Sequence, residues 1–142
     1  MENKLGTRKR NANTERRTRP RRKGDDIAER LLDLGAAVIK LLPQLAKKPG
    51  GKAVVKQLER CGPAGGANYE EARGAESPAD FVHKTRIALK EVRETRYWLQ
   101  LAARAELLCL DGYLAGLIDE SDQLVAILTA CANTARQHAG PS

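Results

Sequence analysis

The sequence predicts an all-α protein: an antiparallel up-down-up-down four-helix bundle preceded by a disordered basic N-terminal tail. Apolar residues recur at steps of three and four in four successive segments, as on the buried faces of bundle helices. Segments rich in glycine, proline and aspartate separate them, and these short connections favour antiparallel neighbours. With 142 residues the chain fits one domain. We therefore expect a tail over residues 1–24, a bundle over residues 25–138 and a disordered C-terminus over residues 139–142.

Two helices are expected in the first half of the bundle. The first opens at Asp25, where negative charge suits the positive end of the helix dipole, and we expect it to end at Pro43. The second begins near Lys52. Pro63 lacks a backbone N–H and clashes with the preceding turn, so we expect a kink or break there before the helix resumes up to Ala72. The expected core residues are Ile27, Leu31, Leu34, Val38 and Leu41, then Val54, Val55, Leu58 and Cys61.

Two longer helices are expected in the second half. Ser77 is a candidate N-cap, Pro78 stands at the first helical position and Asp80 stands where a capping-box acid would be. This third helix is expected to reach about Leu108, with an Asp-Gly turn over residues 109–112, and the fourth helix fades after His138. The expected core residues are Phe81, Thr85, Ala88, Val92, Thr95, Leu99 and Ala102, then Leu114, Leu117, Ser121, Leu124, Leu128, Cys131 and Ala135.

The segment from the second to the third helix carries a resemblance to a known family. Its pieces are ANYEEA (67–72), ES (76–77), DF (80–81), IALKE (87–91) and ETRYWL (94–99), with LIDE (117–120) and Leu124 in the last helix. The chain thereby resembles the bacterial four helix bundle protein family, which includes proteins encoded by intervening sequences in 23S ribosomal RNA genes. The resemblance covers roughly residues 25–136. The departure is CGPAGG (61–66), where a continuous helical run with a Ser-Ile pair is expected.

The resemblance carries its own expectations. It implies an antiparallel four-helix bundle, a homopentamer and no catalytic residue. Relatives with this fold act as accessory proteins of reverse transcriptases in diversity-generating retroelements and bind nucleic acid. The resemblance therefore implies RNA or DNA as a partner, together with a partner protein such as a reverse transcriptase.

The net positive charge of the chain comes from its first 24 residues. They contain ten Lys or Arg and two Glu, a balance of +8, whereas the remainder carries −1. With few apolar residues this segment cannot bury enough surface to offset its ordering entropy, so we expect it to be disordered. Such an arm can neutralise phosphates and release counterions, and the alternative is a tail that only keeps the protein soluble.

Basic residues also recur on two of the expected helices, at spacings that place them on outer faces. The alternative to phosphate binding is a solvated face paired with nearby glutamates. Aromatic residues are scarce beside them, Tyr97 excepted, so base stacking is not indicated and binding should show little sequence preference. The candidate nucleic-acid-binding residues are Arg8, Lys9, Arg10, Arg16, Arg17, Arg19, Arg21, Arg22 and Lys23 in the tail, Lys52, Lys56 and Arg60 on the second helix, and Arg86, Lys90 and Arg93 on the third.

A second apolar line accompanies the core face of the third helix, with glutamates among its members. A wide core stripe explains it, and so does a subunit interface in which a buried aromatic residue concentrates binding energy. The pentamer implied by the resemblance favours the interface. Its candidate residues are Ile87, Glu94, Trp98 and Leu101.

No pattern of an enzyme is present. A di-iron bundle needs two Glu-x-x-His pairs, and the sequence offers one Asp80-x-x-His83. Three cysteines without CxxC spacing indicate a reducing cytoplasm, and we find no secretory signal and no apolar run long enough for a membrane. We therefore predict a non-enzymatic, cofactor-free cytoplasmic oligomer that binds nucleic acid with little sequence specificity. The alternative is a structural or protein-interaction oligomer with no nucleic-acid role.

Overall fold

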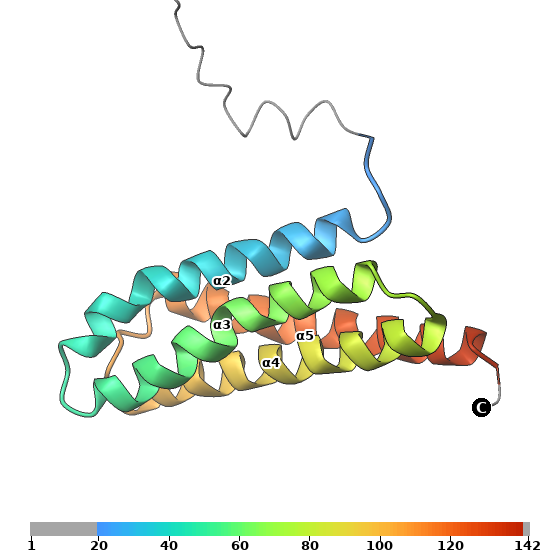
Figure 1. The fold of residues 1–142 in the computed structure, drawn as a ribbon. Coiled ribbons are helices and arrows are strands. Elements are labelled where there is room, and N and C mark those ends of the chain that lie inside the picture. Colours follow the sequence, from blue (N-terminus) through green and yellow to red (C-terminus); the bar gives the residue numbers. More distant parts are fainter. Residues whose placement is uncertain (1–19, 141–142) are drawn as a thin grey trace, which may run out of the picture.

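The computed structural model describes residues 20–140 as four long helices and the turns between them. These are α2 (Asp25–Ala46), α3 (Gly51–Arg73), α4 (Pro78–Arg104) and α5 (Gly112–His138). Each helix packs against the helices before and after it, and α2 packs against α5, so the four close into a square (Figure 1). Successive helices run in opposite directions, and the described residues contain no strand. The predicted fold class is confirmed.

The antiparallel order gives the bundle two distinct ends. α2 and α4 begin, and α3 and α5 end, at what we call the tail end, because the N-terminal segment leaves the bundle there (Figure 1). The opposite, far end holds the turns between α2 and α3 and between α4 and α5. The predicted disorder of residues 1–24 and 139–142 falls largely on residues 1–19 and 141–142, which lie outside the described residues.

The core face of α4 matches the predicted heptad pattern. Its buried residues are the predicted ones except at the start, where Val82 is buried and Phe81 is only half-buried. Phe81 instead lines a hollow at the tail end together with Ile27 and Tyr69. The buried face of α4 therefore begins at Val82, one residue later than predicted. The largest fully buried side chains elsewhere include Leu31 and Leu45 of α2, Leu58 of α3, and Leu124 and Leu128 of α5.

Two helices begin at side-chain caps. The Ser77 hydroxyl accepts a hydrogen bond from the Asp80 backbone N–H at 3.1 Å, with Pro78 at the first helical position as predicted. The Asp80 carboxylate in turn accepts from the Glu76 N–H at 3.3 Å, one residue before the position of an ideal capping box. At the far end the Asp111 carboxylate accepts from the Leu114 N–H at 2.9 Å and caps α5.

Two predicted boundaries are wrong, and the break considered at Pro63 is absent. α2 does not end at Pro43 but continues to Ala46, because a proline in the last turn removes only one hydrogen bond of an ending ladder. α3 has no break at Pro63 and runs uninterrupted through it. α4 ends at Arg104 rather than near Leu108, and the connection to α5 spans residues 105–111.

Close helix packing accounts for the continuity of α3. A Cβ atom on Gly62 would lie 2.7 Å from Cγ1 of Val38 on α2, and one on Gly65 would lie 2.8 Å from Cγ2 of Val92 on α4. On the other side of the first contact, a Cβ on Gly35 would meet the Gly62 carbonyl oxygen at 3.3 Å. The glycines around Pro63 are therefore contact points of α3 with its neighbours. The tertiary contacts that they permit hold a helix that local propensity disfavours.

Cross-helix ion pairs bridge all four lines of contact between neighbouring helices. Each joins an arginine of one helix to a carboxylate of the next, and the side chains are partly solvent-exposed, so each contributes modestly to stability. The pairs are Arg73–Asp25 between α3 and α2, Arg60–Glu91 and Arg60–Glu94 between α3 and α4, Arg96–Asp122 between α4 and α5, and Arg30–Glu120 between α2 and α5.

Candidate nucleic-acid interface

Three basic residues lie on the outer face of α4. Arg86, Lys90 and Arg93 are exposed, and none of them makes an ion pair with a residue that the structure describes. Spacings of four and three residues place them along one line, roughly 6 and 4.5 Å apart in rise along the helix. We call this group the α4 basic surface. Its charges are free to contact an external anion.

The acidic residues of α4 lie on another flank. Glu91 and Glu94 face α3, where both pair with Arg60, Glu91 at 3.3 Å. The hydrogen bond from Arg60 to Glu94 raises the pKa of the Arg60 guanidinium above its ordinary value. Asp80 pairs with Lys84, and the hydrogen bond from the Glu76 backbone N–H lowers the pKa of the Asp80 carboxyl. On α4 the acids Glu91, Glu94 and Asp80 are thus engaged by Arg60 and Lys84, whereas the α4 basic surface lies on the outer face.

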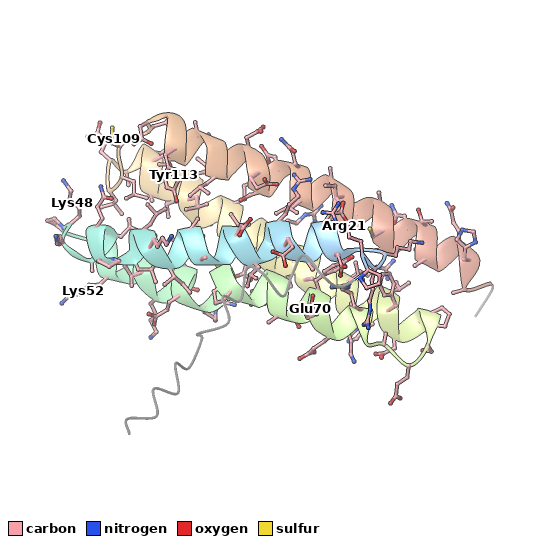
Figure 2. The ribbon with its side chains drawn as sticks, turned by 90° about the horizontal axis from the view of Figure 1, so that it is seen from above. Arg21, Lys48, Lys52, Glu70, Cys109 and Tyr113 are labelled. Carbon is pink, nitrogen blue, oxygen red and sulfur yellow. The ribbon has the colours of Figure 1, made fainter. Side chains whose placement is uncertain are left out.

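The basic residues predicted on α3 do not extend the α4 basic surface as a group. Lys52 and Lys56 are exposed, but Arg60 is already engaged by the two glutamates. Figure 2 shows Lys52 at the far end beside Lys48, whereas Arg21 lies toward the opposite end. The two predicted stripes thus differ in position and in charge compensation. Of these two stripes, the α4 stripe has all three of its cations without an ion-pair partner among residues 20–140.

The tail residues are placed only in part. Arg21, Arg22 and Lys23 are exposed and immediately precede α2 at the tail end. The backbone N–H of Arg22 donates a hydrogen bond to the Asp25 carboxylate at 2.7 Å, which fixes the chain where it enters the helix. The other candidates in the tail lie outside the described residues; they are Arg8, Lys9, Arg10, Arg16, Arg17 and Arg19.

The predicted subunit interface on α4 is largely occupied within the chain. Trp98 packs against the hydrophobic core and meets Tyr97 edge to face, with ring centroids 5.0 Å apart. Glu94 is engaged by Arg60, while Ile87 and Leu101 are half-buried. This line resembles a wide core stripe more than a free apolar face. Its assignment to an interface stays a prediction.

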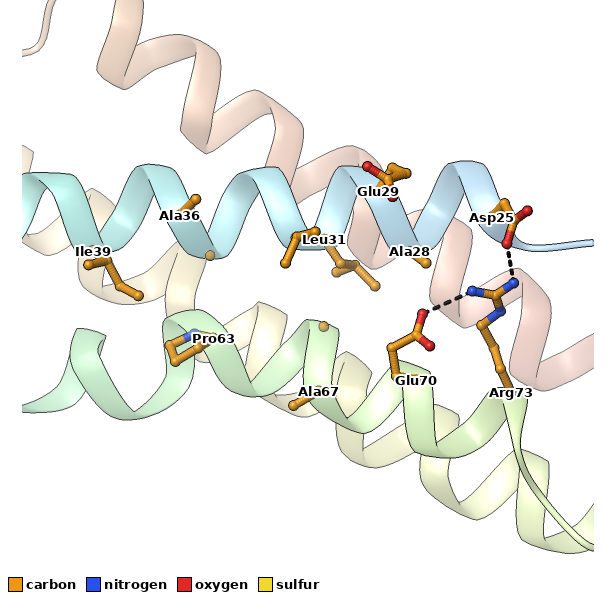
Figure 3. Close-up of a pocket in the computed structure, with 13 residues that line it drawn as sticks. Asp25, Ala28, Glu29, Leu31, Ala36, Ile39, Pro63, Ala67, Glu70 and Arg73 are labelled. Atoms are coloured by element: carbon orange, nitrogen blue, oxygen red, sulfur yellow. Dashed lines mark hydrogen bonds and ion pairs between the residues drawn. The ribbon is translucent and has the colours of Figure 1, made fainter. Parts of the chain in front are cut away.

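A more apolar exposed surface lies between α2 and α3. Leu32 and Ile39 are 52% and 51% exposed and flank a hollow of about 510 Å³ (Figure 3). Its floor includes Gly35 and Gly66, where an added Cβ would meet the Gly62 carbonyl oxygen at 3.3 Å and Leu31 at 3.5 Å, so these glycines let the two helices approach closely. We call this the α2–α3 groove. Sequence reasoning missed it, although Leu32, Ala36 and Ile39 recur at helical spacing and were available as a signal.

One end of the α2–α3 groove is polar. Arg73 reaches from α3 to Asp25 on α2 and also pairs with Glu70 at 2.9 Å, as the dashed lines in Figure 3 show. The hydrogen bond with Asp25 raises the pKa of Arg73, so this guanidinium is held in place as a charged bridge. The network closes the groove toward the tail end. The groove is therefore apolar along its length and charged at one end only.

The described residues contain neither a metal-binding cluster nor a membrane-spanning helix. No group of three or more histidine, cysteine or acidic side chains is placed to hold a metal ion. No helix of residues 20–140 combines the length and the hydrophobicity needed to cross a membrane.

Comparisons with known proteins agree with this architecture. The model of the 23S rRNA-intervening sequence protein family matches residues 25–130. The chain is similar to a crystal structure of a protein with unknown function from the S23 ribosomal protein family of Bacteroides thetaiotaomicron VPI-5482, with 31% identity and a TM-score of 0.69. That match covers 75% of this chain and 97% of the other. No curated protein matches the sequence. The resemblance found in the sequence is confirmed, and the chain belongs to the 23S rRNA-intervening sequence protein family.

Proposed function

We propose that this protein is a non-enzymatic, oligomeric helical bundle that binds RNA or DNA through backbone phosphates, as an accessory to a nucleic-acid enzyme such as a reverse transcriptase. The observation that carries the proposal is the separation of charge on α4. Arg86, Lys90 and Arg93 are exposed and have no ion-pair partner among the described residues, while the acids of the same helix are engaged by Arg60 and Lys84.

Phosphate contact suits this surface better than base reading does. Arginine and lysine neutralise phosphates and release condensed counterions, a contribution that is independent of sequence. Tyr97 is the exposed aromatic residue beside the α4 basic surface, so a row of stacking platforms is absent from this described face. The basic tail adds ten cations at one end of the bundle. RNA is the first nucleic acid to test, because the family's description names 23S rRNA.

The α2–α3 groove supports the oligomeric part of the proposal. Leu32 and Ile39 expose apolar surface next to a groove floored by glycine, and contiguous apolar hollows of this kind mark protein contacts. Self-association would bring several tails together and raise avidity without new contacts. If the groove alone is functional, the protein is a structural or protein-interaction oligomer, which is the second candidate function.

Fluorescence anisotropy with a short labelled RNA of mixed sequence tests the proposal. Wild type is compared with K90Q/R93Q, which removes two charges of the α4 basic surface, and with the matched control K40Q/K47Q, which removes two exposed charges of α2 and the turn after it. Each single-strand phosphate contact contributes about 0.7 to the slope of log affinity against log salt, so K90Q/R93Q should flatten it by about 1.4. The triple variant R8Q/K9Q/R10Q should flatten it by about 2.

The control separates local contact from net charge, because both double variants lower the charge of the chain equally. Equal slopes for K90Q/R93Q and K40Q/K47Q would move the contact away from α4. Absence of binding by wild type at about 50 mM salt would leave the structural oligomer as the function. Light scattering of L32E/I39E then tests that candidate, since charges in the α2–α3 groove should lower the mass of an oligomer that uses it.

A further inference from the structure

Another hollow lies at the tail end between α4 and α5. Its volume is about 400 Å³, and it is lined by His83 and Arg86 of α4, by Arg136 of α5, and by small residues of α4 and of the chain after α5. His83, Arg86 and Arg136 are all exposed. Among the described residues, neither arginine has an ion-pair partner. Two unpaired guanidinium groups from different helices therefore line one concave site.

The surroundings of this hollow contain little negative charge. Asp80 is the acid of α4 nearest to it in sequence, and it is engaged by Lys84 and by the Glu76 N–H and does not line the hollow. On α5 there is no acid after Asp122, so its last four turns carry only neutral and basic side chains. An anion placed between the arginines would meet no carboxylate on either flanking helix.

Helix stability explains part of this arrangement but not all of it. Arg136 lies in the last turn of α5, where a cation favours the negative end of the helix dipole. That role is also available to His138 in the same turn. It gives no reason for His83 and Arg86, on the neighbouring helix, to line the same hollow as Arg136. A bound anion would account for all three.

We propose that this hollow, formed by His83, Arg86 and Arg136, is a phosphate-binding site. Arginine matches phosphate geometry through paired N–H donors, and two arginines with an imidazole can contact several oxygens of one tetrahedral group. Arg86 is also the first residue of the α4 basic surface, so a strand anchored in the hollow continues along Lys90 and Arg93. The inference rests on the proposed function for its ligand, a phosphate of a nucleic acid, either at a chain end or within the backbone.

Two 3′-labelled RNAs of identical sequence, one with a 5′-phosphate and one with a 5′-hydroxyl, distinguish these sources. Full-length wild type is compared with R86Q and R136Q, and with R104Q as a control that removes an exposed arginine from the far end of α4. A lost charge-assisted contact should weaken binding about tenfold in R86Q and R136Q and leave R104Q close to wild type. A loss confined to the 5′-phosphorylated RNA assigns the hollow to a terminal phosphate, and an equal loss with both RNAs assigns it to a backbone phosphate.

If wild type binds neither RNA, the proposed function is contradicted. A second measurement then still tests whether the hollow binds phosphate. The melting temperature is followed in sodium phosphate and in sodium chloride of equal ionic strength, because a ligand that binds only the folded state stabilises it. Phosphate should raise the melting temperature of wild type and R104Q above the chloride value and should not do so for R86Q or R136Q. An equal phosphate effect in all four proteins, or RNA affinities of R136Q and R104Q that fall together, would overturn the site.

Discussion

Replacing Gly62 with alanine should destabilise the bundle, although alanine is the better helix former. The new Cβ would lie 2.7 Å from Cγ1 and 3.1 Å from Cβ of Val38, a fully buried and β-branched residue with little freedom to turn away. Overpacking of this kind costs about 1 to 3 kcal/mol, and the gain in helix propensity returns about 1 kcal/mol. The net loss should be up to about 2 kcal/mol, which at its upper end lowers the melting temperature by several degrees for a bundle of this size.

The matched control is Gly116→Ala on α5, where an added Cβ meets no atom within 4 Å. This variant should gain about 0.5 to 1 kcal/mol from helix propensity alone. Urea unfolding followed by circular dichroism measures both, at one protomer concentration so that self-association contributes equally. Opposite signs for the two variants support the close approach of α2 and α3. If Gly62→Ala proves as stabilising as Gly116→Ala, the packing described at this contact is wrong.

Three further predictions concern other features of the bundle. Pro63→Ala restores a backbone N–H in the middle of α3 and should raise the free energy of unfolding in urea by about 1 to 3 kcal/mol, whereas a decrease would mean that the proline ring contributes needed packing. Thr85→Val removes a buried hydroxyl without a hydrogen-bond partner and should stabilise by about 1 kcal/mol. Thr95→Val should gain less, because the Thr95 hydroxyl donates to the Glu91 carbonyl at 2.9 Å, and equal gains would contradict this assignment. A thiol reagent should label exposed Cys109 first and Cys61 only on unfolding, since burial raises the pKa of the Cys61 thiol, and rapid native labelling of Cys61 would be inconsistent with its place in the core.

The parts of the fold that depend on local pattern could be predicted from the sequence. The α4 core face follows a regular spacing of apolar and small residues, and Ser77 with Pro78 marks the helix start through interactions within one turn. Pro63 misled because its cost is local while the compensation is tertiary. The local sequence around Pro63 does not indicate that Gly62 packs against Val38 and Gly65 against Val92.

In the candidate site, too, the features set by local pattern could be predicted and those set by tertiary contacts could not. The outward position of Arg86, Lys90 and Arg93 follows from helical spacing, but the sequence could not show that Arg60 is engaged by glutamates 31 and 34 residues away. Arg136 shares a hollow with Arg86, 50 positions earlier in the chain, only because α4 and α5 are antiparallel neighbours. The α2–α3 groove could have been predicted from the sequence, because Leu32 and Ile39 recur at helical spacing beside the core face of α2.

The five cross-helix ion pairs also bear on the handedness of the bundle. Four antiparallel helices joined by short turns can wind around the core in either sense, with the same neighbours and the same residues buried. The two windings differ in which flank of each helix meets which neighbour. In the observed winding Glu91 and Glu94 of α4 meet α3, and Asp122 of α5 meets α4. In the mirror winding every helix would present its opposite flank.

The mirror winding would place like charges at the contact between α4 and α5. Glu91 and Glu94 would face the flank of α5 that carries Glu120, so acid would meet acid between α4 and α5. The observed winding instead gives these carboxylates arginine partners, so the ion pairs favour it over its mirror image, each by a modest amount because the side chains are partly solvent-exposed.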